Sequence, residues 1–321
     1  MKNHLPWGVA AVAAAALILT GCSGPSSEPV PSGSAEMRTV RVAALPIVET
    51  SALWGAIGAG IFRDHNIDVE VVPAQGGAQA IPALLSGDVQ FAVGQPFGPF
   101  RAQLQDLGIV VLSNYASSLE TGPDVNAVVS SAASGITTIA GLAGKRVSVN
   151  SLGAAGDVTI MAAVKAAGGD PTTIQFVEVA FPDAKAQLDA GNIDAAWVPE
   201  PFVSQIVGGG GNLVMYPYQQ TIPGLPLLVN YTTNDLIKSD PQLVDDFTAA
   251  MSEALDWATA NEPLVRQAIK DNLQVPEAVA DHVPLPHFTA TLDKDKIEKL
   301  AHLAVDLGVL PSLPDFTKMY R

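Results

Sequence analysis

The sequence has little cysteine and little positive charge, and each shortage excludes a class of function. Cys22 is the single cysteine among 321 residues, so the chain cannot form an internal disulfide or a site with several thiolate ligands. Lys and Arg number 17 against 32 Asp and Glu, which gives a formal net charge of −15. A surface this acidic repels nucleic acid and anionic lipid, so we expect neither as a partner.

Motifs of common enzymes are also missing. No G-x-S-x-G turn, phosphate-binding P-loop or G-x-G-x-x-G stretch opens a predicted helix. His282 and His287 stand five residues apart among prolines, without a nearby carboxylate pattern typical of a zinc site. We therefore expect no metal, no cofactor and no catalytic residue. The other histidines show no such pattern either: His4, His65 and His302.

Long apolar runs are absent except at the start of the chain. There, a basic start with Lys2 precedes a 12-residue apolar core from Gly8 to Leu19. A bilayer span needs about 20 residues, so this order of segments indicates a secretory signal peptide over residues 1–21. An uncleaved anchor and a buried helix are the alternatives.

The apolar core ends in Leu19-Thr20-Gly21-Cys22, which resembles the lipobox of bacterial lipoproteins. That resemblance implies cleavage before Cys22 and attachment of lipid to it, which uses the only thiol. Each buried methylene contributes about 0.8 kcal/mol, so several acyl chains anchor a protein stably. Ten of the 14 residues from Ser23 to Glu36 are Ser, Gly or Pro, and this composition predicts a flexible linker over residues 22–37. We therefore expect an extracytoplasmic protein anchored to the bacterial cell membrane.

Strands alternate with helices through the rest of the chain, which is long enough for two domains. This alternation predicts βαβ units and an α/β fold with mainly parallel sheets. The predicted strands are Thr39–Leu45, Ile67–Val72, Val89–Val93, Ile109–Tyr115, Lys145–Asn150, Ile174–Val179, Ile193–Val198 and Leu227–Tyr231. The predicted helices are Ser51–Phe62, Ala78–Ser86, Phe97–Leu107, Val158–Ala167, Pro182–Ala190, Pro241–Ala260, Glu262–Leu273 and Lys294–Leu307.

Two segments recur in the same order, which favours two lobes of similar design. Arg41–Ile57 is similar to Arg146–Val164, and Leu84–Pro96 is similar to Leu188–Pro201. We expect the chain to cross between lobes near Tyr115–Asp124 and to return near Asn230–Asn234. Lobe one then spans residues 38–120 and 233–321, and lobe two spans residues 121–232.

Ligands of open parallel sheets bind at the carboxyl ends of the strands, which directs attention to four loops. They are Pro46–Ser51, Gly94–Phe97, Ser151–Asp157 and Pro199–Phe202. The residues in and next to these loops also have purely structural alternatives. Thr50, Ser51 and Asp157 would be helix caps, and Gly153 and Gly156 would be turn glycines. Trp197 would belong to the core, and Glu200 would be a solvated acid.

Charge in these loops bears on the ligand. Glu49, Asp157 and Glu200 are acidic, and the four loops contain no Lys or Arg. A bare inorganic anion gains little from that setting, so an amine or an uncharged heterocycle is the better fit.

The mature chain resembles the nitrate/sulfonate/taurine-type substrate-binding proteins of ABC importers, a family that includes binders of pyrimidine thiamine precursors. The motifs that carry the resemblance are VRVAAL with W-x-A-x-x-x-G-x-F (Trp54–Phe62), LLSGDVQFAVGQP, GLAGKRVSV and AGNIDAAWVPEP. It implies a two-lobed, periplasmic-binding-protein-like fold of type II, each lobe a mixed sheet flanked by helices. The candidate ligand contacts are Pro46, Glu49, Thr50, Ser51, Gln95, Pro96, Ser151, Gly153, Ala155, Gly156, Asp157, Trp197 and Glu200.

The resemblance further implies a function in transport. The two lobes would close on one small organic molecule and deliver it to an ABC permease, and we expect the protein to act as a monomer. An extracytoplasmic enzyme and a ligand-binding protein that feeds a sensor are the alternative interpretations on the same fold.

Overall fold

The computed structural model describes residues 36–74 and 76–321. The predicted signal peptide, the predicted lipidation site at Cys22 and the linker up to residue 35 lie outside the described residues. Among the residues that are described, no helix combines the length and the apolar character needed to cross a membrane.

Within the described part of the chain, one sheet gathers strands from both ends of the sequence. β1 runs parallel to β2 and β3, whereas β10 runs antiparallel to β3 and β4. Val40 and Val42 of β1 are fully buried and Arg41 between them is exposed, the alternation of a half-buried strand. The spatial order is β11 (His287–Phe288), β4 (Ile109–Ser117), β10 (Pro226–Thr233), β3 (Phe91–Gly94), β1 (Arg38–Ala44), β2 (Ile67–Pro73).

The second described sheet uses only the middle of the chain. β6 runs parallel to β7 and β8, and β5 runs antiparallel to β8 and β9. Its order is β7 (Gln175–Glu178), β6 (Arg146–Val149), β8 (Ala195–Pro199), β5 (Asn126–Ser130), β9 (Asn212–Met215). Two mixed sheets flanked by helices confirm the predicted fold class, with more antiparallel pairing than the alternation alone predicts.

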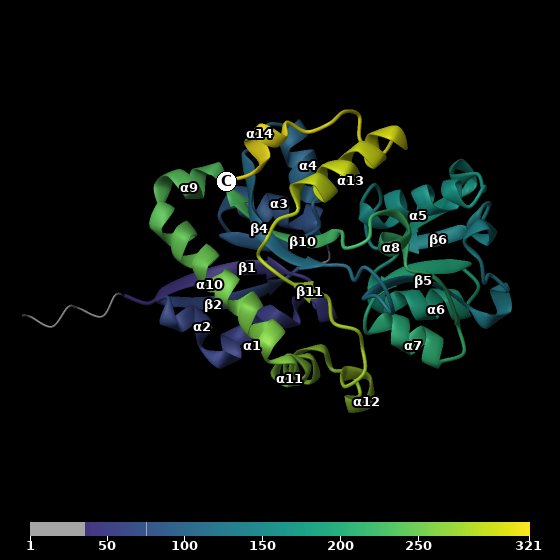
Figure 1. The fold of residues 1–321 in the computed structure, drawn as a ribbon, viewed down its shortest axis with the longest axis horizontal. Coiled ribbons are helices and arrows are strands. Elements are labelled where there is room, and N and C mark those ends of the chain that lie inside the picture. The colour runs from purple at the N-terminus through teal and green to yellow at the C-terminus, as the bar shows by residue number, and fades with distance from the viewer. Residues whose placement is uncertain (1–35, 75) are drawn as a thin grey trace, which may run out of the picture. The chain divides into compact units, whose positions relative to one another are not determined.

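Helices cover both faces of each sheet (Figure 1). Around the second sheet, α5 and α8 lie on one side and α6 and α7 on the other. The helices of the described residues are α1 (Ser51–Ala59), α2 (Ile61–Asp64), α3 (Gly77–Ser86), α4 (Phe97–Leu104), α5 (Ala155–Ala166), α6 (Ala184–Asp189), α7 (Phe202–Gly208), α8 (Pro217–Thr221), α9 (Asn234–Ser239), α10 (Pro241–Ala260), α11 (Glu262–Leu273), α12 (Glu277–Ala280), α13 (Lys294–Asp306) and α14 (Phe316–Met319). Short 3-10 turns are η1 (Val48–Thr50), η2 (Ala132–Ser134), η3 (Ile139–Leu142), η4 (Pro171–Thr173) and η5 (Phe181–Asp183).

One predicted helix is divided in two. The sequence predicts a continuous helix over Ser51–Phe62, but Gly60 adopts φ +85° between α1 and α2. Glycine takes this left-handed conformation without the steric cost that a Cβ imposes. The turn starts the chain back toward β2.

The chain passes between the two sheets twice, once before β5 and once before β10. The segments 118–125 and 222–225 run between the sheets, and the Ser118 N–H donates to the Leu225 carbonyl at 2.8 Å. The second passage thus precedes β10, which pairs with β3 and β4, and it lies a few residues before the expected return near Asn230–Asn234. The division into lobes at the predicted residue limits stays a prediction.

Aromatic side chains fill the space between the sheets and their helices. Phe247 of α10 stacks on Phe91 of β3, with ring centroids 3.7 Å apart. Trp197 of β8 meets Phe181 and Tyr218 edge to face, with centroids 5.6 and 6.1 Å away. This second cluster fixes the position of Trp197, which also faces the cavity described next.

Candidate functional site

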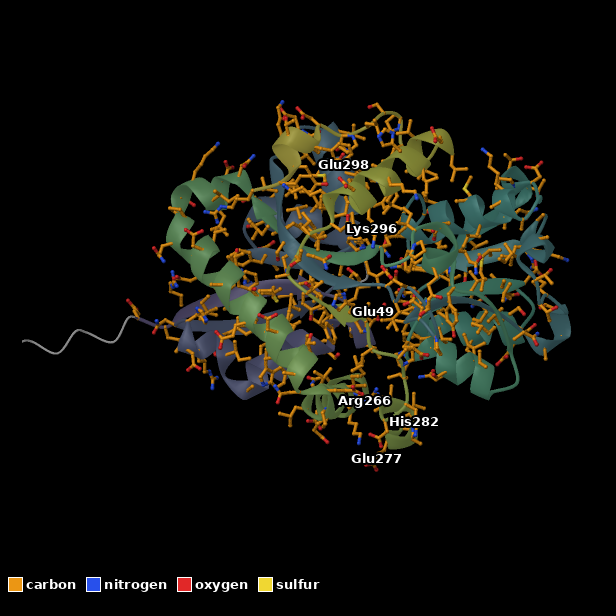
Figure 2. All side chains as sticks on the ribbon, viewed as in Figure 1. Glu49, Arg266, Glu277, His282, Lys296 and Glu298 are labelled. Carbon is orange, nitrogen blue, oxygen red and sulfur yellow. The ribbon has the colours of Figure 1, made fainter. Side chains whose placement is uncertain are left out.

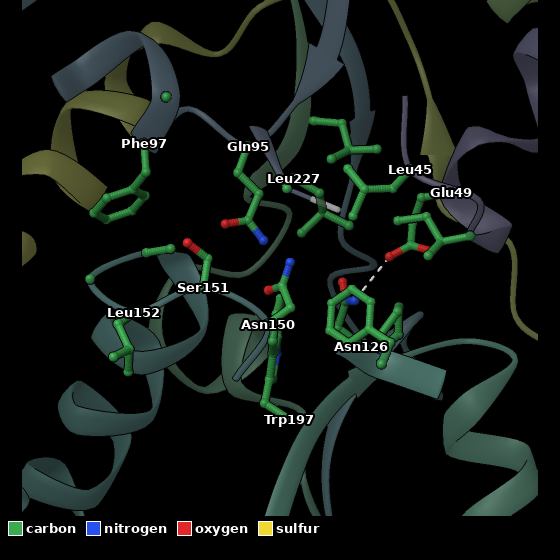
Figure 3. A pocket seen from close by; sticks show the side chains of 18 of the residues that line it. Leu45, Glu49, Gln95, Phe97, Asn126, Asn150, Ser151, Leu152, Trp197 and Leu227 are labelled. Atoms are coloured by element: carbon green, nitrogen blue, oxygen red, sulfur yellow. Dashed lines mark hydrogen bonds between the residues drawn. The ribbon is translucent and has the colours of Figure 1, made fainter. Parts of the chain in front are cut away.

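A cavity of about 120 Å³ is lined by residues from the elements of both sheets. One buried water needs about 10–15 Å³, so this space accepts a small molecule. Figure 3 shows Gln95, which follows β3, and Asn150, which follows β6, directing their amides toward the middle of the cavity. Apolar walls come from Leu45, Ile47, Phe97, Phe181, Trp197, Pro199, Tyr218, Leu227 and Leu228. The cavity thus combines aromatic and aliphatic walls with a few convergent amides, which is typical of ligand pockets.

Glu49 is a buried carboxyl in the wall of the cavity. It lies in the turn η1, its side chain is 2% exposed, and its Oε1 accepts a hydrogen bond of 2.9 Å from the Asn126 amide (Figure 3). Among the described residues, its Oε2 has no hydrogen-bond partner. The pKa of Glu49 is raised to about 8, chiefly by burial; hydrogen bonds from its own backbone and from Asn126 oppose this rise, and the nearby carboxyls of Asp124 and Glu200 add to it.

This raised pKa predicts a pH-dependent stability. Because the folded state holds the proton more tightly than the unfolded state, the contribution of Glu49 is fully present below its ordinary pKa near 4.5 and is lost as the pH rises toward about 8. Each unit of pKa shift is worth about 1.4 kcal/mol. We expect Glu49→Gln and the wild type to have similar free energies of unfolding at pH 5, and the variant to be roughly 2–4 kcal/mol more stable at pH 8.

Urea unfolding at pH 5, 6, 7 and 8 measures this difference. Glu70→Gln, at an exposed position of β2, is the matched control and should follow the wild type. Parallel pH profiles for the wild type and Glu49→Gln would contradict the account of Glu49.

The loop Ser151–Ala154 forms another wall of the cavity and is held from two directions. Asp157, in the first turn of α5, accepts backbone hydrogen bonds from Gly153, from Ala154 at 2.7 Å and from Val158 at 3.1 Å. Arg101 of α4 donates from Nη2 to the Gly153 carbonyl at 2.6 Å. Asp157 therefore sets the conformation of the loop, while Arg101 connects the loop to a helix that packs against the first sheet.

Gly153 and Gly156 each fit a place where a larger residue would clash. Gly153 has φ +70°, and a Cβ there would lie 2.2 Å from Nη2 of Arg101. A Cβ on Gly156 would lie 2.9 Å from the ring of Trp197. The start of α5 thus packs directly on Trp197, whose Nε1 is buried and has no hydrogen-bond partner among the described residues.

The structure brings five of the predicted contact residues to the cavity wall, and these are Glu49, Gln95, Ser151, Gly153 and Trp197. That any of them contacts a ligand stays a prediction. The others lie behind the wall or outside it: Pro46, Thr50, Ser51, Pro96, Ala155, Gly156, Asp157 and Glu200.

Hydrogen bonds to nearby groups account for the positions of Thr50 and Glu200 behind the wall. The Thr50 hydroxyl donates to the Leu45 carbonyl at 2.6 Å, which closes the turn after β1. Glu200 accepts hydrogen bonds from the hydroxyl and the backbone N–H of Ser204, at 3.0 and 3.1 Å. Glu200 is 3% exposed, so the alternative of a solvated acid is wrong for it. Burial raises its pKa and outweighs the bonds from Ser204.

Several residues that line the cavity lie outside the predicted contacts. Arg101 lies one helical turn after Phe97, so the spacing of four residues on a helix that begins at a predicted ligand loop could have indicated it. Asn126 begins a strand that was not predicted. Asn150 follows β6, Phe181 lies in the turn η5 and Tyr218 lies in the helix α8, all outside the four loops. Arg101 brings a basic group to the cavity from α4, outside the four loops, which themselves contain no Lys or Arg.

Within residues 36–74 and 76–321, no group of three or more His, Cys, Asp and Glu side chains is arranged to hold a metal ion. His282 lies with Arg266 and Glu277 at the edge formed by α11 and α12, away from Glu49 (Figure 2). Its Nδ1 is 2.9 Å from the Ala278 carbonyl, so a local backbone contact accounts for this ring.

Comparisons with known proteins identify one family and several solved structures with a similar fold. A model of the family described as NMT1/THI5 like matches residues 49–263, whereas none of the curated proteins matches the sequence. The alkanesulfonate-binding protein SsuA from Xanthomonas axonopodis pv. citri, bound to MOPS, is similar with a TM-score of 0.75 at 17% identity, over 90% of this chain and 100% of that chain.

Two further solved structures have the same fold. The periplasmic nitrate-binding protein NrtA from Synechocystis PCC 6803 has a TM-score of 0.73 at 14% identity, over 89% of this chain and 86% of that chain. The periplasmic aliphatic sulphonate binding protein SsuA from Escherichia coli has a TM-score of 0.68 at 18% identity, over 87% and 91%.

Proposed function

Because the chain belongs to the NMT1/THI5-like family, we propose that it is an extracytoplasmic solute-binding protein of an ABC importer. It captures one small organic molecule, such as a sulfonate, a taurine-like compound or a heterocyclic precursor, and delivers it to a membrane permease. The observation that carries this proposal is the cavity between elements of the two sheets, with its buried polar side chains. The SsuA and NrtA proteins, which bind sulfonates and nitrate, support it through their fold.

The proposed mechanism is capture by closure. Hydrogen bonds already join the half of the site built from elements around the first sheet to the half built from elements around the second sheet. Arg101 donates to the Gly153 carbonyl, and Asn126 donates to Glu49. The Val48 N–H donates to the Glu200 carbonyl at 3.3 Å. A ligand that contacts both halves adds to these bonds only in the closed state and therefore increases its population. The passages at 118–125 and 222–225 are the places where the backbone would bend.

A thermal-shift panel tests the binding function. The probes are nitrate, ethanesulfonate, taurine, pyrimidine and 4-aminopyrimidine. A ligand at 100 times its Kd stabilises the folded state by about 2.7 kcal/mol, so we expect at least one probe to raise Tm by about 5 °C. Chromatography of the same mixtures tests the alternative of an enzyme. Failure of every probe to raise Tm, or conversion of a probe to product, would contradict the proposal.

The anchor is part of the same proposal, because a binding protein serves an importer only if it stays near the permease. We expect the wild type to sediment with membranes and Cys22→Ser to appear in the soluble extracytoplasmic fraction. Ser32→Ala in the linker is the control and should stay with the membranes. Equal distribution of wild type and Cys22→Ser would exclude Cys22 as the lipid attachment site.

A further inference from the structure

The further inference rests on the closure of two lobes in the proposed function and concerns the place where the turn η1 meets the second sheet. Asn126, the first residue of β5, donates to Glu49 of η1 at 2.9 Å (Figure 3). The Val48 N–H of the same turn donates at 3.3 Å to the carbonyl of Glu200, which follows β8. We call this contact the junction; it consists of Val48 and Glu49 on one side and residues 124–126 and Glu200 on the other.

Three carboxyl groups are buried in the junction. They belong to Glu49, Asp124 and Glu200, and each side chain is at most 3% exposed. Strand pairing brings the last two together, because the Glu200 N–H donates at 2.8 Å to the carbonyl of Val125, the neighbour of Asp124. Among the described residues, Oε2 of Glu49 and Oδ2 of Asp124 have no hydrogen-bond partner. The junction therefore keeps water from carboxyls that it satisfies only in part.

The groups that act on these carboxyls do not neutralise them. The charges that act on Glu49 are those of Asp124 and Glu200, and both disfavour its ionised form. The other titratable groups around the junction come from β4, α8 and α5, and they are Tyr115, Tyr216, Tyr218 and Asp157. All of these are acids, so each additional negative charge in the junction meets others of the same sign.

The basic side chains on the surrounding elements have partners of their own. Arg101 lines the same cavity as Glu49, but its Nη2 donates to the Gly153 carbonyl. Val48 packs against α11, and the cations of that helix are Arg266 and Lys270. Both form ion pairs with carboxylates at the edge formed by α11 and α12. The described residues thus place no ion pair on the carboxyls of the junction.

We propose that the junction is a pH-sensitive switch of lobe closure: it stays closed while its three carboxyls hold their protons and opens when they ionise. In the closed state these groups are away from water and close to one another, so a charge that forms there is costly. Opening exposes them to water, which solvates the ionised forms. A rise in pH therefore shifts the population toward the open state, and closure on a cargo becomes weaker.

The pKa values set the pH range of the switch. Burial raises the pKa of Glu49 to about 8 and that of Asp124 to about 6, and it also raises the pKa of Glu200. Exposure in the open state returns these groups toward their ordinary values near 4.5 and 3.8. Their contribution to closure is then fully present below those ordinary values and is lost as the pH rises toward 6 and then 8.

Hydrogen exchange of single amides at pH 5, 6, 7 and 8 tests the switch without any cargo. The Val48 N–H exchanges when the junction opens, whereas Val42 of β1 and Val147 of β6 are paired on both sides within the two sheets and report global unfolding. Each rate is compared with that of an unprotected amide at the same pH. We expect protection at Val48 to fall at least tenfold from pH 5 to pH 8 and protection at Val42 and Val147 to stay greater at every pH.

Variants that cannot ionise identify the groups responsible. In Glu49→Gln combined with Asp124→Asn and Glu200→Gln, protection at Val48 should change less than twofold between pH 5 and pH 8. Glu49→Gln alone should show a smaller fall than the wild type, so the test does not depend on the triple variant. Glu70→Gln, at an exposed position of β2, is the matched control and should keep the full fall.

The outcomes separate the switch from the proposed function. Protection at Val48 that does not fall with pH, that falls equally in Glu49→Gln and the wild type, or that equals the protection at Val42 and Val147 would overturn the switch and leave solute binding standing. Failure of every probe in the thermal-shift panel would instead overturn the solute-binding function, whatever the exchange rates are.

Discussion

Ser151→Phe is expected to weaken the binding of every cargo at least 100-fold, because it places a phenyl ring inside the site. Ser151 is half-buried in the cavity wall, and its hydroxyl points toward Gln95 across the cavity (Figure 3). The cavity measures about 120 Å³, so a phenyl group leaves little room for a ligand. Loss of 100-fold in affinity corresponds to about 2.7 kcal/mol.

The thermal-shift panel run on the variant measures this loss. Ser312→Phe, which adds the same ring at an exposed position, is the matched control and should keep the wild-type response to each probe. Circular dichroism on both variants verifies that the fold is intact. A probe that raises the Tm of Ser151→Phe as much as that of the wild type binds elsewhere, and this would exclude the cavity as the site.

Asp157→Ala is expected to destabilise the protein by about 2–4 kcal/mol and to weaken cargo binding at least tenfold. The carboxylate is 5% exposed and accepts backbone hydrogen bonds from Gly153, Ala154 and Val158. Removing it leaves buried N–H groups without partners, each at a cost of about 1–3 kcal/mol. The loop Ser151–Ala154 then loses one of its two supports, so affinity should fall although Asp157 lies behind the wall.

Asp170→Ala is the matched control for this prediction. Asp170 is an exposed cap whose Oδ1 accepts from the Thr172 N–H at 2.9 Å. Its loss should cost about 1 kcal/mol and leave affinity unchanged. Urea unfolding and titration calorimetry on both variants give the comparison. Wild-type affinity in Asp157→Ala would mean that the loop keeps its conformation without the carboxylate.

The long, strongly periodic elements were predictable from the sequence. The helix over Pro241–Ala260 agrees with α10 at both ends, because Asp240 and Pro241 mark its start and apolar residues recur along one face. The strand that opens the chain is equally clear, since Val40 and Val42 alternate with polar residues. Periodicity is reliable where one face is buried and the other is solvated.

The second sheet was harder to predict because its strands β5 and β9 are short, and β5 is buried on both faces. β5 (Asn126–Ser130) is buried throughout and so lacks alternation, and it carries Asn126 into the site. Pairing of β10 with β3 and β4 depends on contacts between residues more than 100 positions apart, which no local pattern encodes. The sequence therefore predicted the class of fold and underestimated its antiparallel pairing.

The candidate site, like the fold, was predictable in some residues and not in others. Loops at strand ends located Glu49, Gln95, Ser151 and Trp197, because the carboxyl edge of a sheet is a general rule. This rule does not separate wall residues from their supports. Asp157 is predicted as an N-cap or a contact, whereas the N-cap of α5 is Ala154 and the Asp157 carboxylate accepts from the Ala154 N–H. That distinction depends on side-chain direction, which loop position does not specify.

Titration calorimetry of the purified protein with the five panel probes, followed by mass spectrometry of each recovered probe, tests the central claim most directly. The account predicts that at least one probe binds one molecule per chain and is recovered chemically unchanged, and that Ser151→Phe abolishes this binding. No binding by any probe, binding that survives in Ser151→Phe, or recovery of a converted product would contradict the account.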